Sequence, residues 1–319
     1  MNARLALLCA ALALVSLALG PVDLAAVWAR DPELARSLFT ELRLPRTGLA
    51  LVIGAGLGAS GAAAQALFRN PLASPDVLGP SSGAALGAVV AGYFLGAGVI
   101  GMAVGGLAGA GAALVLLMML AGKGAGTTRL VLAGVAVSML IGVAINLALS
   151  LAPSPFALYD LMFWLMGSLN DRSLPQLALA APLILIGVFL LVRAGPALDT
   201  LALGEDVAQS LGVAISGVQA RVVAAIALAT GAGVAVAGSI GFIGLIVPHL
   251  VRPHVGHRPG AAIVPSALGG AALLVAADIA VRLVPAGIDL RLGVLTALIG
   301  APFFIALIIG RPSGRGADA

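Results

Sequence analysis

The sequence predicts an all-α integral membrane protein with about ten transmembrane helices, and three observations carry that prediction. First, only 9% of the 319 residues are charged and 61% are hydrophobic, whereas about a quarter of an ordinary soluble domain is charged. Second, uncharged intervals long enough to cross a bilayer recur along the whole chain. Third, glycines repeat every four residues at Gly54 and Gly58 and at Gly101, Gly105 and Gly109, a spacing that lets helix backbones approach closely in lipid.

The intervals between charged residues locate the spans, because a helix needs about 20 apolar residues to cross the hydrocarbon and a charge within it is costly. The amino-terminal stretch resembles a signal peptide, with one positive charge before a leucine-alanine core. The competing interpretation is an uncleaved first span, 5–20, with its amino end inside, which fits the even span count. The later intervals are 47–68, 77–122 with room for two spans, 130–151, 174–192, 222–251 with one span and a short second one, 261–284 and 293–309.

Basic residues orient these spans. About ten crossings place both ends on one side, and Arg311 and Arg315 after the last span assign that side to the cytoplasm under the positive-inside rule. In this orientation ten basic residues lie inside and seven outside, and four of the seven fall in one outer segment, 30–46. Because this segment runs against the usual bias, it predicts a partner on the outer face.

Two apolar stretches are broken by proline and glycine, "NPLASPDVLGPSSGA" after the second span and "GSIGFIGLIVPHLV" after the seventh. Broken membrane segments are tolerated where protein or a water-filled cavity satisfies the freed backbone groups, so a translocation path is expected beside them. They occupy matching places in the two halves of the chain. Spans two to five and seven to ten then run in opposite senses, which indicates an inverted repeat.

The long inner segment 193–221 has the composition of a soluble domain. Gly204 precedes Glu205 and Asp206, which suit the amino end of a helix, and Gly212 follows as a stop. A short exposed helix is therefore predicted on the inner face, with an ordinary surface turn as the alternative.

The chain shows no energy source of its own. A phosphate-binding loop needs G-x-x-x-x-G-K-[ST], and Lys123 in "LAGKGAG" lacks both the upstream glycine and the following Ser or Thr. An ion-driven carrier needs ionisable groups within its bundle, but Asp278 is the only carboxylate well inside a span. Asp278 precedes Arg282 by four residues, the favourable order for a helical ion pair, so a structural pair is predicted.

Other function classes are also disfavoured. The lone Cys9 lies in an apolar run and excludes a disulfide within the chain. His249, His254 and His257 lie on or near an inner loop without a carboxylate at paired spacing, so no metal site is expected. The formal charge of +4 comes from scattered arginines with no basic patch among aromatics, so no nucleic-acid partner is expected.

Seven blocks resemble, in order and spacing over about 42–309, the FecCD-type permease subunits of bacterial ABC importers for iron-siderophores, haem and cobalamin. The blocks are "RLPR", "SGAAAQALFRNPLASPDVLG", "FWLMGSL", "LALGEDVAQSLGV", "GSIGFIGLIVPHLVR", "ADIAVR" and "GVLTALIGAPFF". The resemblance implies a cobalamin-importer-permease-like fold in which 1–319 form one transmembrane permease domain with a coupling loop at about 197–217. It also implies a multi-pass protein of the bacterial inner membrane, with both termini cytoplasmic.

The partners that the resemblance implies are a second permease subunit, identical or homologous, two cytoplasmic ABC ATPase subunits and a periplasmic substrate-binding protein, within membrane lipid. The chain itself would bind no cofactor and would not be an enzyme, because ATP and Mg are held by the ATPase subunits. Of the substrates, an iron-siderophore complex is the first expectation; haem follows, and then cobalamin.

The resemblance also assigns roles to residues. Docking of the binding protein would fall to Arg43, Arg46 and Arg282, against the alternative that these arginines reach to lipid phosphates. Coupling to the ATPase would fall to Leu203, Gly204, Glu205, Asp206, Ala208, Gln209, Leu211 and Gly212. The cytoplasmic gate would comprise Leu78, Gly79, Pro80, Ser81 and Ser82. Polar, soft or aromatic candidates for the path are Gln65, Met139, Asn146, Met162, Phe163 and Trp164.

One departure and two alternatives remain. The family's Glu-Leu-Pro before the last span is replaced by 289–291, Asp-Leu-Arg, so Arg291 is expected to pair with Asp289 or to join the docking surface. "GASG" at 58–61 is also the nucleophile motif of rhomboid intramembrane proteases, which would need Ser60 and His249 within about 3 Å. An ion-coupled secondary transporter would work without any ATPase.

Overall fold

The computed structural model describes residues 1–20, 22–122, 126–285 and 289–309. Lys123, Arg311 and Arg315, used above for function and orientation, lie outside the described residues. Every regular element in the described ranges is a helix, which confirms the all-α prediction. Six helical stretches in these ranges are long and apolar enough to cross a membrane, namely 32–67, 99–121, 127–150, 174–201, 215–237 and 259–282.

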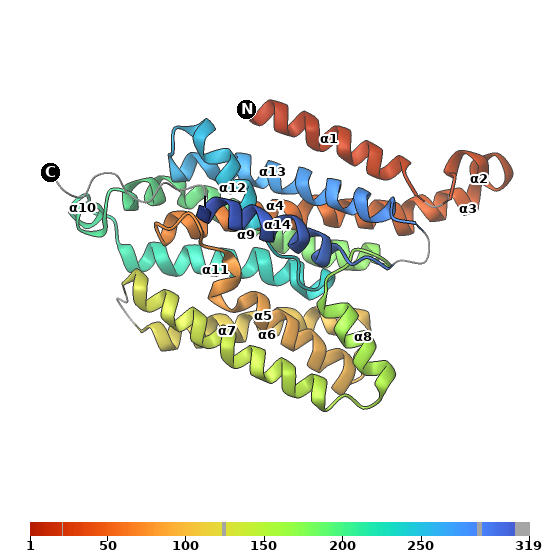
Figure 1. The fold of residues 1–319 in the computed structure, drawn as a ribbon, viewed down its shortest axis with the longest axis horizontal. Coiled ribbons are helices and arrows are strands. Elements are labelled where there is room, and N and C mark those ends of the chain that lie inside the picture. The colour runs from red at the N-terminus through yellow and green to blue at the C-terminus, as the bar shows by residue number, and fades with distance from the viewer. Residues whose placement is uncertain (21, 123–125, 286–288, 310–319) are drawn as a thin grey trace.

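The long helices lie side by side, with their axes roughly horizontal in Figure 1. The α-helices are α1 (Asn2–Ala18), α2 (Leu24–Arg30), α3 (Pro32–Ser37), α4 (Leu44–Leu67), α5 (Pro80–Val89), α6 (Val99–Ala121), α7 (Thr127–Ser150), α8 (Pro155–Leu165), α9 (Leu174–Leu201), α10 (Glu205–Ser210), α11 (Ile215–Ala237), α12 (Ile243–Val251), α13 (Pro259–Arg282) and α14 (Leu292–Ile309). Short π or 3₁₀ turns are η1 (Leu38–Arg43), η2 (Pro75–Leu78), η3 (Val90–Phe94) and η4 (Arg252–Val255).

The predicted span boundaries agree with these helices where charge spacing was clear. The interval 77–122 divides into α5 with η3 and then α6, and 222–251 divides into the long α11 and the short α12. The coupling loop is shorter than predicted, because 197–201 continue α9 and 215–217 begin α11. Apolar neighbours along both helices explain this extension, since Leu198, Leu201 and Val218 are buried in the bundle.

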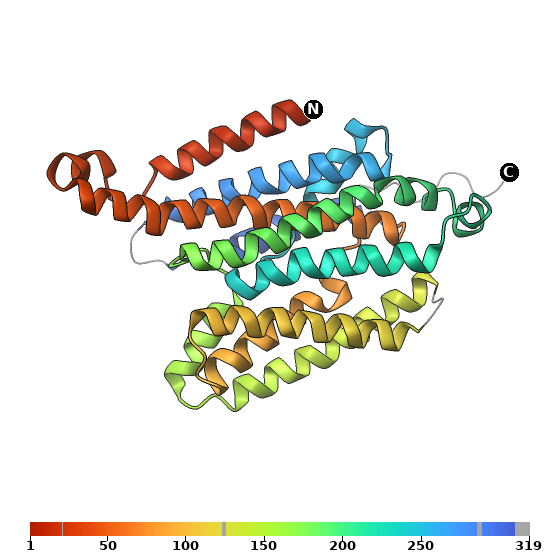
Figure 2. The ribbon, with the colours of Figure 1, turned by 180° about the vertical axis from the view of Figure 1, so that it is seen from behind.

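The centre of the bundle is the close pair α4 and α13, which lie side by side in Figures 1 and 2. A Cβ added at Gly58 would lie 1.9 Å from the carbonyl oxygen of Ser266, and one at Gly54 would lie 2.4 Å from that of Gly270. These glycines therefore set the distance between the two backbones, as their spacing predicted.

A second close pair joins α5 and α6, below the centre in Figure 1. Added Cβ atoms at Gly105 and Gly109 would lie 2.7 Å and 2.1 Å from the carbonyl oxygens of Gly87 and Gly83. Gly101 differs from the other two, because its added Cβ would meet only the side chain of Ala97 in the turn before α6. The predicted glycine repeat thus serves helix packing at two of its three positions.

The two ends of the bundle differ in what they carry. In Figure 1, α2 and α3 project at one end, whereas α10 and η4 lie at the opposite end. The functional residues predicted from the sequence divide between these ends, with the arginines near α2 and the coupling residues at α10.

Candidate functional site

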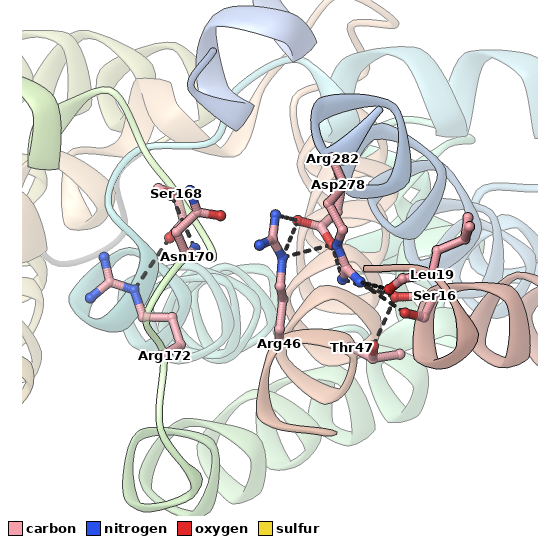
Figure 3. Close-up of polar contacts among 9 residues, drawn as sticks. All are labelled: Ser16, Leu19, Arg46, Thr47, Ser168, Asn170, Arg172, Asp278 and Arg282. Carbon is pink, nitrogen blue, oxygen red and sulfur yellow. Dashed lines mark hydrogen bonds and ion pairs between the residues drawn. The ribbon is translucent and has the colours of Figure 1, made fainter. Parts of the chain in front are cut away.

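The amino end of α4 and the carboxyl end of α13 share one buried carboxylate. Asp278 is 1% exposed, and Nε of Arg46 donates to its Oδ1 at 2.9 Å and to its Oδ2 at 3.1 Å. Nη2 of Arg282, one turn along α13, donates to the same Oδ2, so the predicted ion pair is confirmed. Figure 3 shows Asp278 between the two guanidinium groups. Arg46 lies 232 positions from Asp278, so no local sequence pattern links it to this pair.

The carboxyl end of α1 is held by two of the predicted docking arginines. Arg282 donates from Nη1 to the carbonyl oxygen of Ser16 at 2.8 Å and from Nη2 to its hydroxyl at 3.0 Å. Arg43, whose exposure is only 8%, donates at 2.6 to 2.9 Å to three further carbonyl oxygens. These acceptors belong to Leu17, Ala18 and Val22. Because a helix leaves its last carbonyls without internal partners, cations there are doubly favourable.

A cavity of about 280 Å³ opens beside this network, with an arginine-rich wall. Its lining includes all three predicted docking arginines, Arg43, Arg46 and Arg282, together with Arg172 and the carboxylate of Asp171. Burial lowers the pKa of the Arg172 guanidinium; Asp171 opposes this shift. Arg172 was missed by sequence analysis because it follows α8 in a short connection that no span count singles out.

The docking role of Arg43, Arg46 and Arg282 stays a prediction, but the structure defines what each can offer. The side chain of Arg46 is 19% exposed and that of Arg282 is 7% exposed, and both are bound to Asp278. The three arginines are therefore part of the chain's own framework, and their charges contribute a positive field to the cavity.

At the other end of the bundle, the short helix predicted in the inner segment is confirmed as α10. Gly204 has a φ of +114°, a conformation that glycine adopts without strain, and so lets the chain turn from α9 into α10. Ala208 faces the bundle with no exposed surface. Leu203, Val207 and Leu211, spaced by four, are 65%, 46% and 65% exposed. An apolar stripe thus faces outward between the predicted coupling residues Asp206, Gln209 and Gly212.

Glu205 links α10 to α7 and to the segment that follows α4. Its Oε1 accepts a hydrogen bond from Oγ1 of Thr127, at the amino end of α7, at 2.5 Å. The same oxygen lies 3.9 Å from Nη2 of Arg69, just after α4. Glu205 therefore connects α10 to the start of α7 and to the segment that leads from α4 to the predicted gate.

The predicted gate residues form a buried turn against α7. Leu78 has no exposed surface, and Gly79 has a φ of +95° with its added Cβ only 2.8 Å from Cγ1 of Val137. Pro80 is the first residue of α5, where its missing N–H needs no partner. Ser81 is 7% exposed and Ser82 is half-buried. The turn is packed as a unit with α7, although a gating role itself stays a prediction.

The predicted path residues divide into two groups. Gln65 is 2% exposed and bonded within the bundle, because it accepts a hydrogen bond from Arg252 at 2.6 Å and donates one to the carbonyl oxygen of Leu245 at 3.3 Å. The others lie toward the surface of the single chain. Met139 is 68% exposed, and Asn146, seven residues later on α7, is also exposed. On α8, Met162 and Phe163 are exposed and Trp164 is half-buried.

The geometry gives the protease alternative no support. Oγ of Ser60 is buried and hydrogen-bonded to none of the described residues, so it does not reach His249. The His249 ring packs edge-on against Phe303, with centroids 5.9 Å apart. Within the described ranges, no three side chains of His, Cys, Asp or Glu gather as a metal site would require.

The Asp-Leu-Arg sequence at 289–291, which differs from the family pattern before the last span, contains an ion pair. Nη2 of Arg291 donates to Oδ2 of Asp289 at 2.6 Å, as one of the two expectations held. The Arg291 guanidinium also lies over the ring of Phe163, 4.9 Å from its centroid. A cation–π contact thereby connects this turn to α8, in place of a rigid proline.

Comparison with known proteins gives consistent matches over nearly the whole chain. The FecCD transport family matches residues 4–310. The chain is 41% identical over 280 residues to the vitamin B12 import system permease protein BtuC of Vibrio cholerae, covering 87% of this chain and 84% of that protein. It is 38% identical over 289 residues to the hemin transport system permease protein HmuU of Yersinia pestis, covering 87% and 85%. A solved inward-facing metal-chelate type ABC transporter superposes with a TM-score of 0.86 at 30% identity, over 97% of this chain and 98% of that chain.

Proposed function

Because the chain belongs to the FecCD transport family and is therefore a permease subunit of an ABC importer, we propose that it forms the translocation path for a metal chelate. The permease function agrees with the multi-pass helical bundle and with the similarity to a metal-chelate transporter. One observation carries the mechanistic proposal most directly: Glu205 on α10 is hydrogen-bonded to α7, which packs on the buried turn at Gly79.

The proposed substrate is a chelate of the cobalamin or haem kind. Two relatives that match over most of the chain are named for vitamin B12 and hemin. Neither of these relatives is named for an iron-siderophore complex, which was the first expectation from the sequence. We therefore rank iron-siderophore complexes third among the proposed substrates.

The proposed topology has ten crossings of the inner membrane with both termini in the cytoplasm. The six long apolar stretches supply part of it, and α1, α5 with η3, α12 and α14 supply the rest as shorter crossings. The halves correspond in order, because the long α4 is followed by the short α5 just as the long α11 is followed by the short α12. The central contacts also correspond, since α4 packs on α13 and α11 packs on α6. This double correspondence supports the inverted repeat.

The proposed energy source for transport is ATP hydrolysis by a pair of separate ATPase subunits that dock on α10. Three exposed apolar side chains on so short a segment need a cover, and they flank charged residues that define an orientation. Movement of α10 would reach the gate turn, 78–82, through Glu205 and α7. ATP and Mg would be bound on these partner subunits.

A second permease subunit is proposed to cover the exposed face of α7, so that Met139 and Asn146 would line the path between two copies or two homologues. The periplasmic binding protein is proposed to dock over the arginine-walled cavity, which suits acidic side chains. Charges at such a rim favour encounter and orientation more than affinity.

The test is ATP-dependent uptake into proteoliposomes. The chain reconstituted with its ATPase and binding protein should accumulate cyanocobalamin or hemin and should not accumulate a ferric siderophore, and the chain without its ATPase should accumulate none. Uptake by the chain alone would overturn the importer proposal, whereas uptake of only the siderophore would overturn the substrate proposal and leave the importer intact.

A further inference from the structure

A second cavity, of about 240 Å³, lies at the α10 end of the bundle. It is formed where α4, α9 and α12 end and α13 begins. Its polar wall consists of Gln65, Arg69, Arg252, His257 and Arg258, and the remaining lining is alanine and proline. No carboxylate is among the described residues that line it. Figure 2 shows the α12–α13 connection, which carries three of these residues, at the same end as α10.

One arginine of this wall is held from within the bundle. Nη2 of Arg252 donates to Oε1 of Gln65 at 2.6 Å, and Gln65 is 2% exposed. An arginine that merely extends toward lipid headgroups would point away from the helices, whereas this one is tied to a buried amide. Fixing a guanidinium in advance lowers the entropy lost when it binds an anion.

Two carboxylates of the described residues pair with arginines of this wall but are not part of the lining. Asp199 lies 3.2 Å from Nη2 of Arg258 and accepts the backbone N–H of Gly260 at 2.7 Å. Glu205 lies 3.9 Å from Nη2 of Arg69 and is already bonded to Thr127. Among the described residues, three arginines line the cavity and these two carboxylates lie behind it, so the described side chains give the interior a positive potential.

We propose that this cavity binds one net-anionic phosphate group. Guanidinium groups match the oxygen geometry of phosphate, and basic pockets between transmembrane helices at the cytoplasmic surface suit anionic headgroups. The group belongs either to an anionic phospholipid or to free phosphate, and the chemistry at the arginines is the same. This inference goes beyond the proposed function, because no phosphate group takes part in it; the wall includes Gln65, which the sequence predicted for the path but which is bonded within the bundle.

The experiment uses the full chain purified in detergent and native mass spectrometry, with phosphatidylglycerol, phosphatidylcholine of the same acyl chains, and inorganic phosphate as probes. The test variant combines Arg69→Gln with Arg258→Gln, whose side chains are 47% and 72% exposed, so the fold should persist. The matched control combines Arg193→Gln with Arg221→Gln, which line a different cavity of about 240 Å³. Nε of Arg221 donates to Gly217 of its own helix.

The test variant should bind phosphatidylglycerol at least about tenfold more weakly than the wild type and the control, since hydrogen bonds to charged groups are at stake. This result, with inorganic phosphate competing, identifies a lipid source. A selective loss of phosphate binding without any lipid adduct identifies free phosphate. Three results would each overturn the proposal. The test and control variants could lose equal amounts of probe binding, the wild type could retain both lipids equally, or the test variant could bind the probes as the wild type does. The variant that combines Arg69→Lys with Arg258→Lys keeps both positive charges but loses the planar guanidinium groups. Its affinity for phosphatidylglycerol should lie between those of the wild type and the test variant.

Discussion

The Arg46 guanidinium on α4 donates through Nε to both carboxylate oxygens of Asp278 on α13, joining residues 232 positions apart in the sequence. The carboxylate is buried, and Arg282 binds it as well. The central helix pair is thus held by glycine contacts along its length and by an ion-pair network at one end.

We predict that Asp278→Asn destabilises the protein by about 3–5 kcal/mol, because it leaves the buried guanidinium of Arg282 without a counter-charge. The control is Asp289→Asn, which removes a carboxylate that is 57% exposed and paired with Arg291. An exposed pair contributes about 0–1 kcal/mol. Thermal unfolding in one detergent compares the two, and equal shifts would contradict the structural role of Asp278.

The second prediction concerns coupling through Glu205. Glu205→Ala removes the acceptor for Thr127 and the charge beside Arg69, so it should uncouple α10 from α7. In proteoliposomes containing the ATPase, substrate uptake should fall about tenfold while ATP hydrolysis persists.

Asp206→Ala is the matched control for this prediction, because it removes the neighbouring acid of the same helix. Among the described residues, the Asp206 side chain has no hydrogen bond or ion pair, and its backbone carbonyl accepts a hydrogen bond from Oγ of Ser210 in α10. If both substitutions lower transport equally, then the acidity of α10 matters and the link to α7 does not.

A third prediction follows from Asp76, in the turn η2 before the predicted gate. Burial raises the pKa of the Asp76 carboxyl, and a hydrogen bond from Ser74 opposes this shift. The folded protein therefore holds the proton more tightly than the unfolded chain, whose aspartates titrate near pH 4. The contribution of the protonated Asp76 carboxyl to the free energy of unfolding is fully present below that pH, and it is lost as the pH rises through the pKa of the folded protein.

Asp76→Asn cannot ionise, so it should be more stable than the wild type at pH 7, and the two should converge toward pH 4. Asn can still accept the hydrogen bond from Ser74 Oγ, which reaches Asp76 Oδ2 at 3.0 Å. Melting temperatures of both proteins across this range check the expectation. A constant difference at all pH values would show that ionisation of Asp76 is not the cause.

Charge spacing predicted the helices well, because a charge inside lipid is costly and therefore marks where a span ends. The pattern of Gly204, Glu205 and Gly212 likewise predicted α10, since glycine and the helix dipole act locally. Long-range partners could not be predicted in this way. Nothing in the sequence neighbourhood of Arg43 indicates that it binds the end of α1, or that Arg46 shares a carboxylate with Arg282.

The glycines likewise show that local sequence patterns predict the kind of contact but do not identify its distant partner. The spacing of Gly54 and Gly58 predicted close packing, but it did not name the partner helix, α13. The "GASG" sequence that also resembles a protease motif lies at the most crowded part of α4, where Gly58 meets Ser266. Its small residues are explained by backbone contacts, so no nucleophile is needed to account for them.

The last prediction separates crowded from open glycines. A Cβ at Gly61 would lie 1.9 Å from the carbonyl oxygen of Gly244 at the start of α12, whereas one at Gly111 on α6 would meet nothing within 4 Å. Gly61→Ala must push two backbones apart, and such overpacking costs about 1–3 kcal/mol or more. Gly111→Ala should instead add up to about 1 kcal/mol, because alanine favours the helix. Thermal unfolding of the two variants in the same detergent should therefore give shifts of opposite sign. If both shifts are positive, the backbones of α4 and α12 do not approach each other closely at Gly61.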